Sequence, residues 1–206
     1  MEPFNYLTQE NGAMCTYLLP TGAPRDLTDK LLCSTTTSRP WLSSSTAGFP
    51  HVLHFDLSGL GKMPTIKRDG APNPGYYRAF GLSCWHAYPS NPAVLKMYIS
   101  RDGRRDWVHW QTIQTEMAAG TQVFKLREKI NAQEVRHIKV EIVRTHGDPE
   151  KTYINQVFLF DKYVSKIQGD MPLQTPCSQG WQSEANKSGG MLHFSKQMNG
   201  VEYQSL

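Results

Sequence analysis

Hydrophobic and polar residues alternate along the middle of the chain, most clearly at Leu95–Ser100, Val135–Ile142 and Tyr153–Asp161. Turns rich in Gly, Asp and Pro bound these stretches. Alternation with a period of two between such turns is typical of antiparallel strands that bury one face. The pattern therefore predicts a sheet protein rather than a helical one.

The same reasoning predicts seven strands in all. They are His51–Leu57, Tyr77–Ala87, Val94–Ser100, Trp107–Ile113, Gln122–Leu126, Val135–Val143 and Ile154–Phe160. In the first of them, Leu53, Phe55 and Leu57 share one face, which we expect to be buried. Many short strands at this spacing indicate an all-β fold, an antiparallel β-sandwich of the jelly-roll type.

The chain divides into three parts by composition. Residues 1–25 read as an N-terminal arm that lies against the domain, residues 26–167 as the sandwich, and residues 168–206 as an extended C-terminal tail. The tail is too poor in apolar residues to build a core. Its isolated anchors for a partner would be Trp181, Leu192, Phe194 and Tyr203. A disordered tail is the alternative.

Composition and cysteine content narrow the class of protein and its compartment. The chain has 206 residues, 19% of them charged, and a formal net charge of +4, which is ordinary globular composition and too mild for a nucleic-acid groove. We expect no signal peptide, because the first residues lack a basic and an apolar region, and we find no apolar run near the ~18 residues of a membrane span. The four scattered cysteines are expected to stay reduced. These features predict a cytoplasmic protein with no nucleic-acid partner.

Six short motifs, each weak by itself, occur in a fixed order between residues 27 and 157. It comprises Leu27-Thr28-Asp29, Trp41, Phe49–Leu57, Ser100-Arg101-Asp102-Gly103 with Trp107, Val135–Val140 and Ile154-Asn155-Gln156-Val157. In this order the motifs resemble those of the discoidin (coagulation factor V/VIII type C) domain and its intracellular relative, the DOC domain. The resemblance covers roughly residues 26–161 and implies a galactose-binding-domain-like sandwich without catalytic activity. The sequence ends Gln204-Ser205-Leu206 rather than Ile-Arg, which argues against the DOC subunit of the anaphase-promoting complex.

Catalytic and metal chemistry find little support. His51 and His54 are three residues apart on an expected strand, so they face opposite sides and cannot chelate one ion. Asp26, Asp29 and Asp56 could offer oxygen ligands to calcium, but surface or turn aspartates are the simpler interpretation. No phosphate-binding loop and no nucleophile elbow occurs. We expect no enzyme, no cofactor and no metal.

Two loops carry candidate binding residues. The loop at residues 85–92 offers His86, Tyr88 and Asn91, which could bind a sugar or anchor a peptide, unless Trp85 is a core residue and the loop only turns the chain. The loop after Ser100 offers Arg101, Arg104 and Arg105, which could face an acidic partner such as a tubulin surface. A solvated turn is the alternative there.

Together these observations predict a non-catalytic protein-binding or scaffold subunit of a large intracellular assembly. Its partners would be tubulin or axonemal and transport proteins, and its setting a cilium or flagellum. One alternative is a substrate-recognition module of a ubiquitin ligase. The other is a carbohydrate- or lipid-binding module, as in extracellular discoidins.

Overall fold

The computed structural model describes residues 3–18, 24–27, 29–32, 40–43, 48–60 and 75–165. All of them belong to the first of two units of the chain, Met1–Leu173. The predicted tail and its four anchors, Trp181, Leu192, Phe194 and Tyr203, lie outside the described residues.

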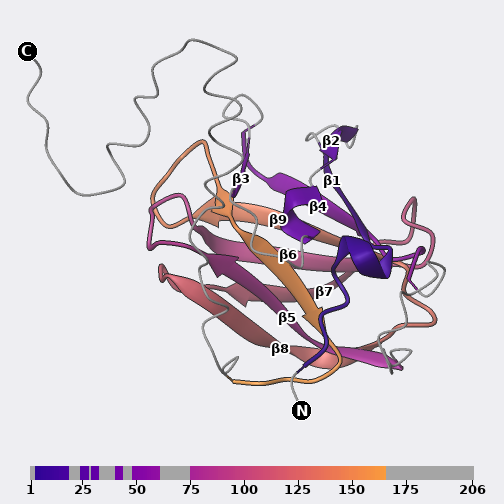
Figure 1. Ribbon diagram of the computed structural model, residues 1–206. Helices are drawn as coiled ribbons and strands as arrows, with labels where there is room; N and C mark the ends of the chain where they lie inside the picture. The colour runs from indigo at the N-terminus through magenta and orange to yellow at the C-terminus, as the bar shows by residue number, and fades with distance from the viewer. Residues whose placement is uncertain are drawn as a thin grey trace, which may run out of the picture. The chain divides into compact units, whose positions relative to one another are not determined.

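Six antiparallel strands form the larger of two sheets, in the order β2–β1–β4–β9–β6–β7 (Figure 1). Their bounds in that order are Pro24–Leu27, Met14–Leu18, His51–Asp56, His137–Thr145, Pro92–Ser100 and Val108–Gln114. The smaller sheet has the order β11–β5–β8, with bounds Gln156–Phe160, Tyr76–Cys84 and Gly120–Asn131. The remaining described elements are the pair β3 (Trp41–Leu42) and β10 (Tyr153–Ile154) and two 3-10 helices, η1 (Gln9–Asn11) and η2 (Asp29–Leu32).

The core lies between the inner faces of the two sheets. Because side chains alternate along a strand, β4 turns Leu53 and Phe55 inward while β9 turns Ile138, Val140 and Ile142 inward. They belong to one apolar cluster with residues of the smaller sheet, including Tyr77, Phe80, Leu82, Val157 and Leu159. None of these side chains is more than 2% exposed. Burying residues of this size stabilises the fold by about 1.5–3 kcal/mol each.

The predicted all-β sandwich is confirmed, and its strands lie close to where the alternation placed them. Leu53, Phe55 and Leu57 are buried together, and Trp41 is a core residue at 6% exposed. Among the seven predicted strands, the largest difference in length is β8, which is much longer than the expected Gln122–Leu126. Strands β1, β2 and β3 were not predicted.

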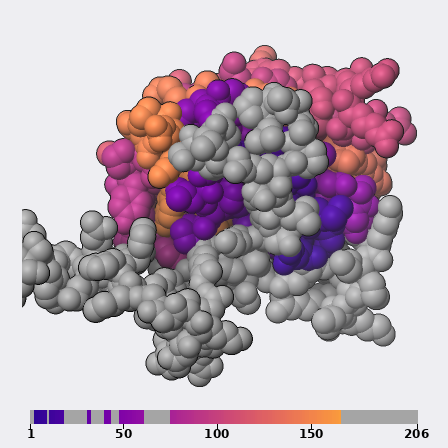
Figure 2. All heavy atoms as spheres, turned by 90° about the horizontal axis from the view of Figure 1, so that it is seen from above, coloured from indigo at the N-terminus to yellow at the C-terminus, as the bar shows by residue number. Residues whose placement is uncertain are grey.

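The segment predicted as an N-terminal arm contributes to the larger sheet. Within β1, Cys15 and Tyr17 are buried whereas Met14 is half exposed, so the strand alternates like the others. Seen from above, the indigo N-terminal residues lie beside the purple residues around position 50 (Figure 2). Asn5 also pairs with Phe160 at the end of β11.

Two cysteines fall within the described residues. Cys15 and Cys84 are both buried. Burial raises the pKa of Cys84 to about 12, so this thiol stays protonated and unreactive at neutral pH.

Side chains from β7 close the gap between the edges of the two sheets. The Gln111 side chain accepts a hydrogen bond from the Arg127 N–H (2.8 Å) and donates one to the Lys125 carbonyl (3.2 Å). The Trp110 indole N–H donates to the Glu128 carbonyl at 3.2 Å. These side chains therefore take the place that a neighbouring strand would hold beside β8.

A buried histidine on the inner face of β4 joins three parts of the chain. Nε2 of His51 donates to the Glu150 carbonyl at 2.9 Å and lies 3.0 Å from the Ser43 hydroxyl, while Nδ1 lies 2.9 Å from the Tyr17 hydroxyl. Because a carbonyl oxygen only accepts, the proton of the neutral ring sits on Nε2 and Tyr17 donates to Nδ1. Burial lowers the pKa of His51, and the Glu150 carbonyl and Asp148 only partly oppose this.

We expect His51 to make the fold acid-sensitive. Its pKa in the folded chain lies below the usual 6.5, so the unfolded chain takes up the proton first, and the stability that neutral His51 provides is lost as the pH falls below 6.5. Replacing His51→Ala should lower the free energy of unfolding by about 3 kcal/mol near pH 8, because Tyr17 and Glu150 lose a partner. This deficit should shrink towards pH 5.

Urea unfolding between pH 5 and pH 8 measures the effect of His51. The matched control is His86→Ala, since the His86 imidazole is exposed and should contribute little. A deficit for His51→Ala that is the same at both ends of the pH range would contradict the assignment.

Candidate functional site

Strand β6 separates the two loops in which binding residues were predicted. His86, Tyr88 and Asn91 precede the strand, whereas the loop with the three arginines follows it. With nine residues at about 3.3 Å each, β6 places the two loops roughly 26 Å apart, at opposite ends of the sandwich. They cannot form one site.

The loop before β6 is braced from within. His86 and Tyr88 are exposed, their rings lie 5.2 Å apart, and the Tyr88 ring meets Tyr153 edge-on at 5.7 Å. Asn91 differs from the prediction, because it is 1% exposed and its amide donates to the His86 carbonyl at 2.7 Å. Asn91 therefore holds the loop in shape and does not present its side chain to solvent. Trp85 is partly buried and packs against the core.

At the other end, strand register lines up side chains on the outer face of the larger sheet. One row across five strands consists of Thr16, His54, Lys139, Tyr98 and His109. A second row, nearer the end of the sheet, consists of Met14, Asp56, His137 and Ser100. Neighbouring strands are about 4.8 Å apart, so the first row spans roughly 19 Å. These are the positions that alternation turns away from the core.

The turn after β6 is held by the side chains of Ser100 and Asp102. Asp102 accepts hydrogen bonds from the N–H groups of Arg104 (2.9 Å) and Arg105 (3.1 Å), and these bonds lower the pKa of its carboxyl group. The Ser100 hydroxyl accepts from the Gly103 N–H at 3.1 Å and lies 2.9 Å from the Arg105 carbonyl. The predicted Ser-x-Asp-Gly turn is therefore present, and its three arginine side chains are exposed.

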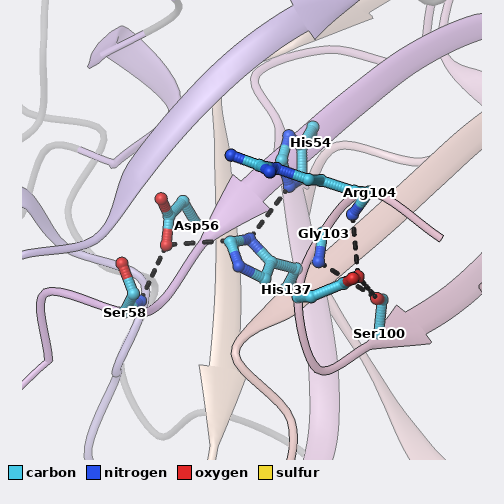
Figure 3. Close-up of polar contacts among 8 residues, drawn as sticks. His54, Asp56, Ser58, Ser100, Gly103, Arg104 and His137 are labelled. Carbon is cyan, nitrogen blue, oxygen red and sulfur yellow. Dashed lines mark hydrogen bonds and ion pairs between the residues drawn. The ribbon is translucent and has the colours of Figure 1, made fainter. Parts of the chain in front are cut away.

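Gly103 fits the turn against the sheet. Its φ is +71°, a conformation that glycine adopts readily, and a Cβ there would lie 2.7 Å from the ring of His137. The turn thus rests directly on the His137 imidazole. Figure 3 shows the Arg104 side chain extending beside His54 from this turn.

Two imidazoles and a carboxylate lie under the turn (Figure 3). Nε2 of His54 is 3.2 Å from Nδ1 of His137, which in turn is 3.7 Å from Oδ1 of Asp56. Burial lowers the pKa of His54, and the nearby His137 and Lys139 lower it further. Burial raises the pKa of Asp56, but hydrogen bonds from Ser58 and the charge of His137 outweigh this, so the pKa is lowered overall.

Trp107 contacts two residues of the first row, His54 and Lys139. Its ring meets His54 edge-on at 5.5 Å, and the Lys139 ammonium lies 5.2 Å from the Trp107 ring and 4.4 Å from the Tyr98 ring. The same ammonium is 3.2 Å from Glu141. Burial and a hydrogen bond to Glu141 raise the pKa of Tyr98. We call His54, Trp107, His137 and Lys139, together with the turn 100–106, the outer-face site.

The chemistry of the outer-face site suits binding of a ligand or a partner. It offers aromatic surface, guanidinium groups and imidazoles on a sheet face held by hydrogen bonds. Among the described residues, no three His, Cys, Asp or Glu side chains are grouped as metal ligands. Asp56, considered above for calcium, bonds to Ser58 (2.8 Å) instead, and the side chains of Asp26 and Asp29 lie outside the description. His51 and His54 lie on opposite faces of β4, as predicted.

Sequence reasoning missed most of the outer-face site. Trp107, His137 and Lys139 were read only as strand or motif residues, and His54 only as an unsuitable metal ligand. The alternation does assign Lys139 and His54 to solvent-facing positions. The alternation does not determine which strands are neighbours, so it could not show that β4, β9 and β6 lie side by side.

No protein-family model matches the chain, and no curated protein does. Several solved structures share its fold. One is a Clostridium perfringens module named CpGH89CBM32-5, in complex with GalNAc-β-1,3-galactose, with a TM-score of 0.51, 16% identity and coverage of 75% of this chain and 98% of that one. Another is the family 32 carbohydrate-binding module of NanJ from the same organism, in complex with galactose (TM-score 0.53, 10% identity, coverage 77% and 98%).

The F5/8 type C domain of a Bacteroides fragilis protein is similar to the same degree, with a TM-score of 0.51, 11% identity and coverage of 79% and 97%. The chain therefore has a discoidin-like fold, which is the fold that the order of its motifs predicted. Among the described residues, no helix is long and apolar enough to cross a membrane.

We expect Gly103→Ala to strain the outer-face site. A methyl group there must displace the His137 ring in addition to adopting a positive φ. The matched control is Gly48→Ala, which has a similar φ of +66° but nothing within 4 Å of the added carbon. Urea unfolding should show that Gly103→Ala costs about 1–2 kcal/mol more than Gly48→Ala.

A double-mutant cycle then isolates the contact between the turn and the sheet. Removing the ring with His137→Ala should recover most of the difference between the two glycine variants. Equal losses for Gly103→Ala with and without the His137 ring would show that the turn does not rest on this imidazole.

Proposed function

We propose that this chain is a non-catalytic binding subunit that docks a protein of a larger assembly through the outer-face site. The observation that carries the proposal is the turn 100–106, which is fixed by its own hydrogen bonds and holds three exposed arginines beside the half-buried Trp107.

Such a surface has the composition of a protein-binding hot spot. Tryptophan, tyrosine and arginine are the residues whose truncation most often costs binding energy at interfaces. The turn is already ordered, so a partner would bind it with little loss of conformational entropy. Among the described residues, Trp107 belongs to neither apolar cluster and is only half-buried, so part of its ring can meet a partner.

The proposed setting is a large intracellular assembly, with tubulin, axonemal or ciliary transport proteins as partners. A ubiquitin ligase, with this chain as its substrate-recognition module, is the alternative. Both settings rest on the sequence resemblance, and the identity of the bound partner separates them. The tail anchors Trp181, Leu192, Phe194 and Tyr203 would add a second contact.

Affinity purification of the tagged full-length chain, followed by mass spectrometry, tests the proposal. Replacing Trp107→Ala should reduce recovery of the specific partner at least tenfold, because truncating a hot-spot aromatic typically costs about 2 kcal/mol or more. The matched control is Tyr88→Ala, another partly exposed aromatic at the opposite end, which should leave recovery unchanged. A partner found this way is then purified, and its affinity for both variants is measured directly.

The outcomes separate the candidate roles. Tubulin, axonemal or transport proteins lost with Trp107→Ala support the scaffold role, and a truncation after Lys166 shows whether the tail contributes. A cullin, RING or HECT ligase lost with Trp107→Ala supports substrate recognition. Partners bound equally by wild type and Trp107→Ala would rule out the outer-face site.

A second candidate is a carbohydrate-binding module. Two of the structural neighbours are described with a bound galactose-containing ligand, and here the exposed rings of His86 and Tyr88 could stack on a sugar. Titration of the 15N-labelled chain with galactose should then shift amide signals at residues 85–91, and Tyr88→Ala should abolish the shifts. Trp107→Ala serves as the control in this experiment, and unchanged spectra up to high millimolar galactose would exclude this candidate.

A further inference from the structure

We propose that a second surface, on the smaller sheet, binds an acidic segment of a partner protein. This basic stripe consists of Arg78 on β5 and Lys125, Arg127 and Lys129 on β8, together with the ring of Tyr76. All five side chains are exposed. The stripe lies on the smaller sheet, whereas the outer-face site lies on the larger sheet. The inference therefore stands independently of the proposed function.

An irregularity in strand pairing creates the stripe. Tyr77 pairs with Ile130 and Ala79 pairs with Lys125, so residues 126–129 of β8 stand opposite Arg78 alone. Leu126 still points into the core, at 3% exposed, while residues 127–129 are all exposed. The extra residues in β8 thereby add charged side chains to an edge that regular alternation would half bury.

Tyr76 fixes part of the stripe in place. The Lys129 ammonium lies 3.9 Å from the centre of the Tyr76 ring, and the Arg78 guanidinium lies 6.0 Å from it. These are cation–π distances. The two charges are therefore held near one another before any partner arrives, although their mutual repulsion would favour separation.

The stripe concentrates the positive charge of the chain. Within the described residues, none of its four cations lies in an ion pair, and Glu128 is the only carboxylate among residues 76–78 and 125–129. Four cations against one carboxylate leave an excess of three, compared with a formal net charge of +4 for the whole protein. An anionic partner would relieve this unbalanced charge.

The geometry favours an acidic polypeptide over other polyanions. Residues 125–129 of β8 stand beside the two-residue step from Ala79 to Tyr77, about 6.6 Å on a strand, so their three cations are spread over a shorter length of the sheet than on a regular strand. Adjacent carboxylates of an acidic segment, about 3.3 Å apart per residue, can match such closely placed cations. The backbone edge of β8 is already used by Gln111 and Trp110. Recognition would therefore run through side chains and not through an added strand.

Nucleic acid and membrane fit the stripe less well. Lys129 occupies the face of Tyr76, which keeps that ring from stacking on a base. Lys125, Arg127 and Lys129 stand beside a step of β5 only about 6.6 Å long, which is too short for the many phosphate contacts of a nucleic-acid groove. Four basic residues alone bind an anionic membrane with roughly millimolar affinity.

Fluorescence anisotropy with the full-length chain and a fluorescein-labelled octaglutamate peptide tests the inference, with octaglutamine as the uncharged control probe. The variant Lys125→Gln, Arg127→Gln, Lys129→Gln should weaken octaglutamate binding at least tenfold in 50 mM salt. The matched variant Lys96→Gln, Arg144→Gln, Lys151→Gln removes the same charge from outside both sites and should weaken binding less than twofold. A third variant, Arg101→Gln, Arg104→Gln, Arg105→Gln, measures the contribution of the outer-face site. Thermal melting of all three variants checks that they fold.

Each outcome decides the matter. Equal weakening by the stripe variant and the matched variant would mean that only net charge matters. Greater weakening by the arginine variant than by the stripe variant would assign acidic recognition to the outer-face site instead. Tighter binding of a single-stranded DNA octamer or of phosphatidylserine vesicles than of octaglutamate would also overturn the proposal. If the stripe variant unfolds, Lys125→Gln and Lys129→Gln are measured singly, each with an expected loss of at least twofold.

Discussion

The antiparallel register of β4, β9 and β6 is the constraint on which the outer-face site depends. It places Asp56 beside His137 and His54 beside Lys139, and it brings Tyr98 next to the same lysine. The same register turns Ile138, Val140 and Ile142 into the core. A slip by one residue would expose these apolar side chains and bury the charged ones, so the core fixes the geometry of the surface.

Each end of β6 serves a different purpose. At the start of the strand, the backbone N–H groups of His146 and Gly147 donate to the carbonyls of Asn91 and Pro89, so the two loops there mainly hold each other. At its end, the turn folds back over the sheet and leaves its three arginine side chains exposed. The discoidin-like sandwich thus supplies a rigid body, and binding depends on what individual turns present.

Much of the fold could be predicted from the sequence, because alternation is a local property. Leu53 and Phe55 lie on the buried face as expected, and the Ser100–Gly103 turn forms from its own side chains. The irregular pairing opposite Arg78 could not be predicted, since it depends on how β5 and β8 meet across the sheet. The burial of Asn91 could not be predicted either, because a loop that contains Pro and Asn is usually exposed. The outer-face site needed the register of three strands that are distant in sequence.

The side chains of Gln111 and Trp110 have a consequence for how this protein can be stored and concentrated. An open strand edge is a template on which further copies of a chain can add, and this is a common route to aggregation. Here the exposed side of β8 is already hydrogen-bonded by glutamine and indole groups from β7. Copies crowded together should therefore resist joining edge to edge along residues 125–128, and loss of Gln111 would leave the Lys125 carbonyl and the Arg127 N–H open to another chain.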